Sequence, residues 1–219
     1  MPEVLKADKN HSEDEIIDRA AAILADGGVM AYPTETFYGL GVDATNQSAI
    51  EKIFTIKGRD FKNPIALIIG QTDDVFPLVK HIPEAARKLM SAFWPGALTI
   101  IFAASGSISP LLTAGTGKIG LRVSSHTIAL KITQKLRKPL TATSANLSGA
   151  LECSRASDVV EQIGDKIDAI VDGGKTPGGQ TSTIIDVTCN PPVILREGAI
   201  SRKAIEITLS RICGPEKVC

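Results

Sequence analysis

The chain has 219 residues and a mass of 23.1 kDa, and its 43% hydrophobic and 22% charged residues exclude the disordered, collagen-like and coiled-coil classes. Its 24 Lys and Arg balance 24 Asp and Glu, and only 4% of residues are aromatic, which disfavours nucleic-acid binding through bulk charge or base stacking. The longest apolar runs fall far short of the roughly 18 residues that a membrane helix requires, which disfavours a membrane protein.

The first predicted element is a helix that begins at Ser12. Ser12 and Glu15 match a capping box, and apolar residues recur at helical spacing until Gly27 and Gly28. The same reasoning predicts the later elements, which in chain order are strand 29–32, helix 48–57, strand 65–69, helix 83–93, strands 97–103 and 119–123, helix 125–136, strand 139–143, a short helix near residue 161, strands 168–172, 182–187 and 192–197, and helix 201–211.

Strands and helices alternate in the first half of the chain, and strands accumulate in the second. This order predicts the α/β class, with helices packed on one mixed sheet rather than a strictly doubly wound fold. We place an N-terminal extension at 1–11, a single domain at 12–211 and a C-terminal tail at 212–219. The N-terminus lacks a signal-peptide pattern, so we expect a cytoplasmic protein whose four cysteines are reduced thiols.

The first candidate binding segment follows the strand at 29–32. Thr34 and Thr36 supply hydroxyl groups, and Gly39 and Gly41 allow a small polar ligand to approach the backbone closely. The alternative is a glycine-rich turn whose threonines form only local hydrogen bonds.

A second segment brings three cations together between a helix and a strand. Lys57 and Lys62 supply point charges and Arg59 a bidentate fork, which is a set of groups that suits a polyphosphate. The alternative is that these cations complement the dipole at the end of the preceding helix.

Two further loops are rich in small residues. Segment 141–149 places Ser144 and Asn146 at the end of a strand, either as hydrogen-bonding groups for a ligand or as ordinary turn residues. Segment 172–183 has four glycines between 173 and 179, and it is interpreted either as a loop that closes over a ligand or as a mobile surface turn.

Arg122 and Arg196 lie within apolar strands, so each is expected to pair with an acidic residue or to face a site. A GxGxxG match at 115–120 leads into a strand, whereas a dinucleotide-binding motif opens a helix. The sequence contains no zinc spacing, carboxylate pair or nucleophile with its base. Cations, hydroxyls and glycines at element ends are typical of a site that binds phosphates and a small zwitterion, and that acts by orientation and charge stabilisation.

Six segments resemble, in matching order from about residue 12 to 205, the YrdC-like family of threonylcarbamoyl-AMP synthases: PTETFYGLG, KGR with NP, GLRV, TSANLSG, TSTIID and ILREGAI. The KxR and SxN motif of that family corresponds here to Lys57, Arg59, Ser144 and Asn146. The resemblance implies a twisted mixed sheet flanked by helices around a positively charged concavity.

The same resemblance implies the chemistry. L-threonine, bicarbonate and ATP would give threonylcarbamoyl-AMP and pyrophosphate, with Mg²⁺ present. Partner proteins of tRNA modification would then pass the threonylcarbamoyl group to the adenosine beside the anticodon. A weak contact with tRNA or double-stranded RNA is a further expectation.

Residue by residue, the resemblance assigns threonine binding to Thr34, Arg122, Ser144 and Ser182. It assigns ATP binding to Lys57, Asn146, Ser154 and Arg196. It assigns catalysis to Lys57, Arg59, Ser144 and Asn146. No protein nucleophile is implied, because a threonine carbamate itself attacks the α-phosphate.

The chain departs from the family pattern at three positions. Asp60 replaces a usual Pro, Ile68 replaces a His of the following strand, and Lys118 replaces a Thr. The chain otherwise resembles the short form of the family, without the extra C-terminal domain. His126, near Arg122 in sequence, is expected to pack at a helix start rather than to serve the site.

Two other functions stay open at this point. One is a module of the same fold that binds double-stranded RNA or tRNA without catalysis, although the neutral charge and few aromatics disfavour it. The other is a paralogue that handles carbamoyl phosphate. Salt-dependent RNA affinity without pyrophosphate release would favour the first, and a requirement for carbamoyl phosphate would favour the second.

Overall fold

The computed structural model describes residues 1–7, 11–58 and 60–210. Its strands are β1 (Glu3–Leu5), β2 (Met30–Tyr32), β3 (Gly39–Gly41), β4 (Ala66–Ile68), β5 (Leu98–Ala103), β6 (Lys118–Arg122), β7 (Leu140–Ser144), β8 (Ala169–Val171), β9 (Thr183–Asp186) and β10 (Val193–Arg196). Its helices are α1 (Glu13–Ala25), α2 (Gln47–Lys57), α3 (Glu84–Phe93), α4 (Pro110–Thr113), α5 (Thr127–Leu136), α6 (Ala156–Ile163) and α7 (Arg202–Ser210), with 3₁₀ turns η1 (Thr72–Leu78) and η2 (Gly164–Lys166).

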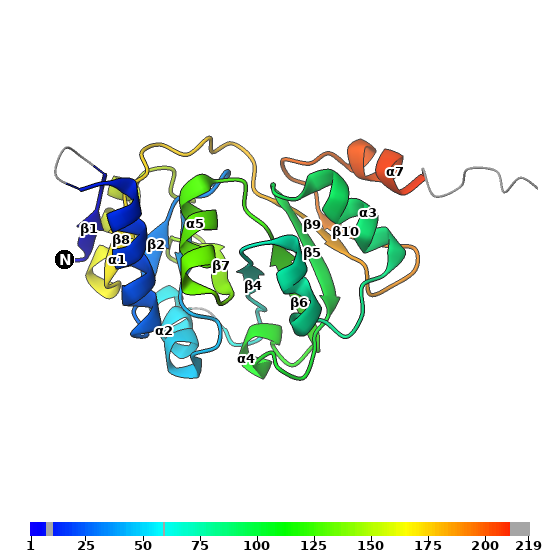
Figure 1. The fold of residues 1–219 in the computed structure, drawn as a ribbon, viewed down its shortest axis with the longest axis horizontal. Helices are drawn as coiled ribbons and strands as arrows, with labels where there is room; N and C mark the ends of the chain where they lie inside the picture. The colour runs from blue at the N-terminus through cyan, green and yellow to red at the C-terminus, as the bar shows by residue number, and fades with distance from the viewer. Residues whose placement is uncertain (8–10, 59, 211–219) are drawn as a thin grey trace, which may run out of the picture.

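The ten strands form one mixed sheet in the order β1-β8-β2-β3-β7-β4-β6-β5-β9-β10 (Figure 1). The pairs β1–β8, β2–β8, β4–β6 and β5–β9 are parallel, and the other neighbours are antiparallel. This topology confirms the predicted α/β class with a mixed sheet. Among the described residues, no helix is both long enough and apolar enough to cross a membrane.

Strand β2 is buried on both faces of the sheet. Ala31 packs in one core cluster with Leu40, whereas Met30 and Tyr32 belong to a second cluster. Successive side chains of a strand point to opposite faces, so one short strand contributes to both clusters. Helices α1 and α5 lie side by side over the second cluster (Figure 1).

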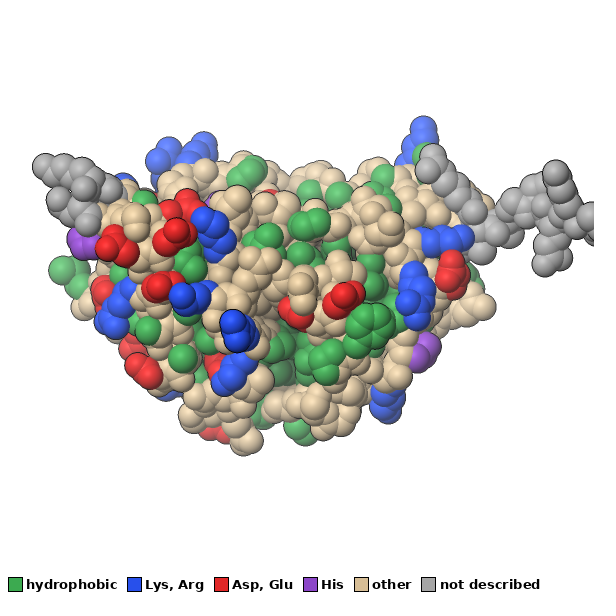
Figure 2. Space-filling model, viewed as in Figure 1, with side chains coloured by type: hydrophobic (Ala, Val, Ile, Leu, Met, Phe, Trp, Pro, Cys, Tyr) green, Lys and Arg blue, Asp and Glu red, His purple; other side chains and the backbone are tan. Residues whose placement is uncertain are grey.

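Cations and acids alternate on the outer surface of α1 and α5 (Figure 2). Lys131 lies 2.7 Å from Glu13, and Lys135 lies 2.6 Å from Asp18. Exposed ion pairs of this kind stabilise a fold by about 1 kcal/mol at most. Their main consequence is that the positive charges of these α5 lysines are neutralised by acidic side chains of α1.

The helices begin and end largely where the sequence predicts. Ser12 and Glu15 form the capping box of α1, and Gly58 ends α2 in the left-handed conformation, with φ of 57°. Two strands were not predicted. β1 lies in the segment expected as an N-terminal extension, yet it pairs with β8 at one edge of the sheet. β3 lies within the segment expected to be a ligand-binding loop.

The glycines of β3 serve the core as well as the cavity, whose wall includes Gly39. A Cβ atom on Gly41 would lie 2.6 Å from Cε1 of Tyr32 and 2.9 Å from Cδ1 of Leu140. A Cβ atom on Gly39 would lie 2.9 Å from Cζ of Tyr32. The Tyr32 ring is fully buried, and its hydroxyl donates to the carbonyl of Thr141 over 2.8 Å. The missing side chains therefore make room for this ring.

Replacing Gly41 with alanine is expected to lower the free energy of unfolding by about 2 kcal/mol, because overpacking a core typically costs about 1–3 kcal/mol. Denaturant unfolding of the purified variant measures this change. Gly106→Ala is the matched control, since a Cβ atom there meets nothing within 4 Å, and its unfolding curve should match that of the unaltered protein. Identical curves for both variants would contradict the role assigned to Gly41.

Candidate active site

A cavity of about 240 Å³ opens where strands from both halves of the sheet come together. Its wall takes residues from the β2–β3 connection and from strands β5, β6, β7, β9 and β10. The polar and charged side chains of the lining are Tyr32, Thr34, Thr36, Tyr38, Thr99, Arg122, Thr143, Ser144, Glu152, Thr181, Ser182 and Arg196. The cavity is therefore rich in hydroxyl groups, and two guanidinium groups of the described residues border it.

Arg122 stands at the end of β6, where it pairs in register with Ile68 of β4. The residue is only 7% exposed, and the sole polar partner of its guanidinium in the described part of the chain is Glu35, with Nη1 3.5 Å from Oε1. The guanidinium donates no hydrogen bond to any described residue. A guanidinium has five N–H donors. Arg122 therefore presents unused donors to the cavity.

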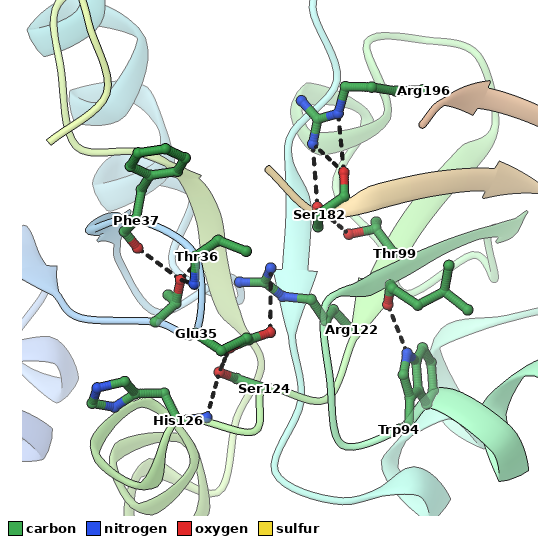
Figure 3. A network of polar contacts seen from close by, with 12 residues as sticks. Glu35, Thr36, Phe37, Trp94, Thr99, Arg122, Ser124, His126, Ser182 and Arg196 are labelled. Carbon is green, nitrogen blue, oxygen red and sulfur yellow. Dashed lines mark hydrogen bonds and ion pairs between the residues drawn. The ribbon is translucent and has the colours of Figure 1, made fainter. Parts of the chain in front are cut away.

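Glu35 is the acidic partner that a buried Arg122 requires. Its Oε2 accepts a hydrogen bond from the hydroxyl of Ser124, which in turn accepts one from the backbone N–H of His126 over 3.2 Å. Figure 3 shows these three residues on one side of the Arg122 guanidinium, with Ser182 and Arg196 on the other. The guanidinium thus lies between an acidic support and a hydroxyl-rich wall.

His126 stands directly before α5 and is not part of the cavity lining, which agrees with its expected place at a helix start. Burial lowers the pKa of its imidazole below the ordinary value of 6.5, so the ring is mainly neutral at pH 7.

Arg196 and Ser182 form the opposite wall. The Arg196 guanidinium donates from Nε and Nη2 to the Ser182 carbonyl, over 3.1 and 2.9 Å, and from Nη2 to the Ser182 hydroxyl over 3.2 Å. That hydroxyl also lies 3.1 Å from the hydroxyl of Thr99. The parallel register of β5 and β9 places Thr99 there. This network holds the Ser182 side chain against the cavity.

Lys57 is directed at the segment that follows β7. Its ammonium donates to the carbonyl oxygens of Ser144 and Asn146 and, over 3.1 Å, to Oδ1 of Asn146. Lys57 and Asn146 are each 4% exposed. The register of β3 with β7, which pairs Gly39 with Ser144, brings this group to the edge of the cavity. Lys57 therefore stands behind Ser144 and outside the lining.

The glycine-rich segment 173–179 is bonded to the first candidate segment. The N–H of Gly178 donates to the Thr36 carbonyl over 2.8 Å, and the Tyr38 hydroxyl donates to the Gly174 carbonyl over 2.8 Å. The N–H of Thr176 donates to the Ser154 carbonyl over 2.9 Å. These contacts disfavour the mobile surface turn, and the closure of this segment over a ligand stays a prediction.

Of the residues predicted at the site, seven line the cavity: Thr34, Thr36, Gly39, Arg122, Ser144, Ser182 and Arg196. Lys57 and Asn146 support Ser144 from behind. Ser154 lies outside the lining, and its backbone N–H and hydroxyl contact Asp158 at the start of α6. Arg59 lies outside the described residues.

Three supporting residues were not predicted as site residues. An arginine inside the apolar strand β6 signalled that an acidic partner exists, but the sequence did not identify Glu35 as that partner. Ser124 and Thr99 gave no signal, because only strand register and the chain turn after β6 bring them to the site.

The charge balance of the cavity is mixed. Among the described residues, Arg122 and Arg196 are the cations of the lining and Glu152 is its acid, while Glu35 pairs with Arg122 from behind. Positive charge of the concavity therefore stays a prediction. Among the described residues, no three His, Cys, Asp or Glu side chains are grouped so that they could hold a metal ion.

The predicted reduced state of the cysteines can be checked for two of the four. Cys153 and Cys189 are free thiols, and burial raises the pKa of Cys153 to about 11, so this thiol stays protonated at neutral pH. Cys213 and Cys219 lie outside the described residues.

Comparison with known proteins gives consistent matches. The model of the Sua5/YciO/YrdC family, described as "Telomere recombination", matches residues 22–198. A threonylcarbamoyl-AMP synthase of Pyrococcus abyssi is 39% identical over 88% of this chain and 57% of its own length. One of Bacillus subtilis is 39% identical over 94% of this chain and 60% of its own length.

The structural comparison agrees. The crystal structure of P. abyssi Sua5 complexed with L-threonine superposes with a TM-score of 0.90 at 37% identity, over 95% of this chain and 61% of that one. The chain thus spans about three fifths of the length of these relatives.

Proposed function

The chain belongs to the Sua5/YciO/YrdC family, and we propose that it is a threonylcarbamoyl-AMP synthase that uses L-threonine, bicarbonate and ATP. The names of the relatives and the threonine complex of P. abyssi Sua5 support this proposal. The observation that carries it in this chain is Arg122, a buried guanidinium at the cavity wall whose N–H donors are unused by the described residues.

Arg122 suits the carboxylate of an amino acid. A guanidinium binds a carboxylate through two parallel N–H···O bonds, which fix orientation as well as charge. Thr34, Ser144 and Ser182 line the same cavity and supply hydroxyl groups for the hydroxyl and amino groups of L-threonine. The three hydroxyls and Arg122 together recognise a small zwitterion that carries its own hydroxyl.

The nucleotide would occupy the side of the cavity bordered by Arg196. Arg196 can contact phosphate oxygens, and Lys57 and Asn146 hold the backbone of segment 144–146 in place beside them. Arg59 and Ser154 complete the set that the family resemblance assigns to ATP and catalysis. Mg²⁺ would enter with ATP as part of the substrate, because triphosphate oxygens and water are its usual ligands and the described residues offer no group of three acidic or imidazole ligands.

The chemistry then needs no protein nucleophile. The neutral α-amine of threonine forms a bond to the bicarbonate carbon and water leaves, which yields a carbamate. A carbamate oxygen next bonds to the α-phosphorus of ATP, and the bond from that phosphorus to the bridging oxygen breaks, so pyrophosphate leaves with the electron pair. Both reactants are anions, so cationic side chains assist by screening repulsion and fixing the two groups in line.

The product is a mixed anhydride of a carbamic acid and AMP. We assign its further transfer to partner proteins of tRNA modification, which would carry the threonylcarbamoyl group to adenosine in tRNA. A weak direct contact between this chain and tRNA or double-stranded RNA stays part of the proposal.

The test is pyrophosphate release by the purified protein from ATP, with L-threonine and bicarbonate omitted in turn from carbon dioxide-free buffer. We expect release only when both are present, together with a product of the mass of threonylcarbamoyl-AMP. Release without threonine, or none under any condition, would contradict the proposal. Carbamoyl phosphate replacing the two substrates, or salt-dependent RNA binding without turnover, would identify the other candidate functions.

A further inference from the structure

Glu35 has an unusual place behind the cavity. It lies in the β2–β3 connection between two threonines that border the cavity, but its own side chain is directed away, toward Ser124 and Arg122. The side chain of Glu35 is 14% exposed and that of Arg122 is 8% exposed. A carboxylate buried to this extent needs a charged partner, because burying an unpaired charge is costly, and Arg122 is that partner.

Ser124 fixes the orientation of the Glu35 carboxylate. The N–H of His126 donates to the Ser124 oxygen over 3.2 Å, so the hydroxyl proton points away from His126 and toward Oε2 of Glu35. With Oε2 held by this bond, Oε1 is turned to Arg122. Glu35 therefore does not rotate freely behind the guanidinium (Figure 3).

The contact between Oε1 and Arg122 is an ion pair without a hydrogen bond. The two atoms are 3.5 Å apart, and Oε1 is buried without a hydrogen-bond partner among the described residues. The N–H groups of Arg122 thus stay available for a second carboxylate in the cavity, while the charge of Glu35 still attracts the guanidinium from behind.

We propose that Glu35 is a positioning residue that, held by Ser124, aims the Arg122 guanidinium at the carboxylate of the amino-acid substrate. The inference rests on the proposed function, since it assumes that L-threonine binds at Arg122. Two effects of Glu35 oppose each other here. Its negative charge weakens the attraction of Arg122 for an anion, and its orientation of the fork strengthens a bidentate contact. We expect the effect on orientation to be the larger one. No other described side chain makes a hydrogen bond or ion pair with the Arg122 guanidinium, so without Glu35 no described polar contact would fix its direction.

The experiment is calorimetric titration of the purified protein with L-threonine and, separately, with L-threoninamide, which lacks the carboxylate. In Glu35→Gln, we expect the Kd for L-threonine to rise about tenfold and the Kd for L-threoninamide to stay within about twofold. Ser124→Ala should shift the Kd for L-threonine in the same direction by a smaller factor. Glu51→Gln, on the exposed surface of α2, is the matched control and should change neither Kd.

The outcomes separate the possible roles. If Glu35→Gln binds L-threonine as well as or better than the unaltered protein, or loses affinity equally for both ligands, the positioning role is wrong. If Glu35→Gln does not fold, as judged from its thermal unfolding, the Ser124→Ala titrations decide in the same way. Unaltered protein that binds L-threonine but releases no pyrophosphate would refute the proposed function and leave this comparison valid. Unaltered protein that does not bind L-threonine would refute both.

Discussion

Replacing Arg122 with leucine is expected to lower the threonine-dependent kcat/KM of pyrophosphate release by more than about a hundredfold. Removing one partner of a buried, hydrogen-bonded charge pair costs about 2–5 kcal/mol, and the substrate carboxylate would lose such a partner. The effect should appear mainly as a higher KM for L-threonine, with the KM for ATP nearly unchanged. Steady-state kinetics with each substrate varied in turn measures it.

The same substitution leaves Glu35 buried without its cation, which is destabilising in its own right. The double variant Arg122→Leu with Glu35→Leu separates the two effects. An apolar pair should restore much of the thermal stability, while kcat/KM for L-threonine stays low. Recovery of activity along with stability would show that Arg122 matters for the fold and does not bind the substrate.

Replacing Lys57 with methionine is expected to lower both stability and activity. Methionine keeps about the length of the side chain but removes the ammonium, which donates to four oxygens of Ser144 and Asn146. Hydrogen bonds to charged groups contribute about 1.5–3 kcal/mol each, and the buried acceptors would be left unpaired. We expect the free energy of unfolding to fall by about 3 kcal/mol and pyrophosphate release to fall more than about tenfold.

Lys52→Met is the control for that experiment. Lys52 lies on the same helix, and its ammonium donates to the Gly27 carbonyl over 2.9 Å, far from the cavity lining. Loss of the Lys52 ammonium should change the free energy of unfolding only slightly and leave the rate of pyrophosphate release unchanged. If Lys57→Met unfolds normally but is inactive, Lys57 acts on the substrates directly rather than through segment 144–146.

The fold could be predicted from sequence wherever a local pattern determines an element. The Ser12 and Glu15 capping box and the Gly58 terminus of α2 are decided by side chains within a few residues of each other. Strand β3 could not be predicted in this way. Its Gly-Leu-Gly sequence disfavours a strand, and it forms because the Tyr32 ring occupies the space above the glycines and because β2 and β7 pair with it. Tertiary packing therefore overrides local propensity there.

The site shows the same division. Hydroxyls at element ends and arginines within apolar strands predicted Thr34, Ser144, Arg122 and Arg196, the family resemblance added Ser182, and these line the cavity. The contacts of Glu35, Ser124 and Thr99 that support these residues could not be predicted from the sequence, because they join residues that are distant along the chain. Lys57 illustrates this, since three cations in one loop suggested a polyphosphate, whereas its ammonium is bonded to the segment after β7.

The wall of the cavity draws on the chain from Tyr32 to Arg196, and strands β2, β3 and β7 at one end of the site must meet β5, β9 and β10 at the other. A ribosome releases the N-terminal segments first, so the residues of β2 and β3 emerge long before those of β9 and β10. The hydroxyls of Thr34 and Thr36 bond to each other and, from Thr34, to the Phe37 carbonyl, whereas the Thr36 carbonyl accepts its bond from Gly178 near the far end of the chain. Nascent chains that stop short of Arg196 therefore lack one wall of the cavity, and substrate can stabilise the fold only after nearly all described residues have been synthesised.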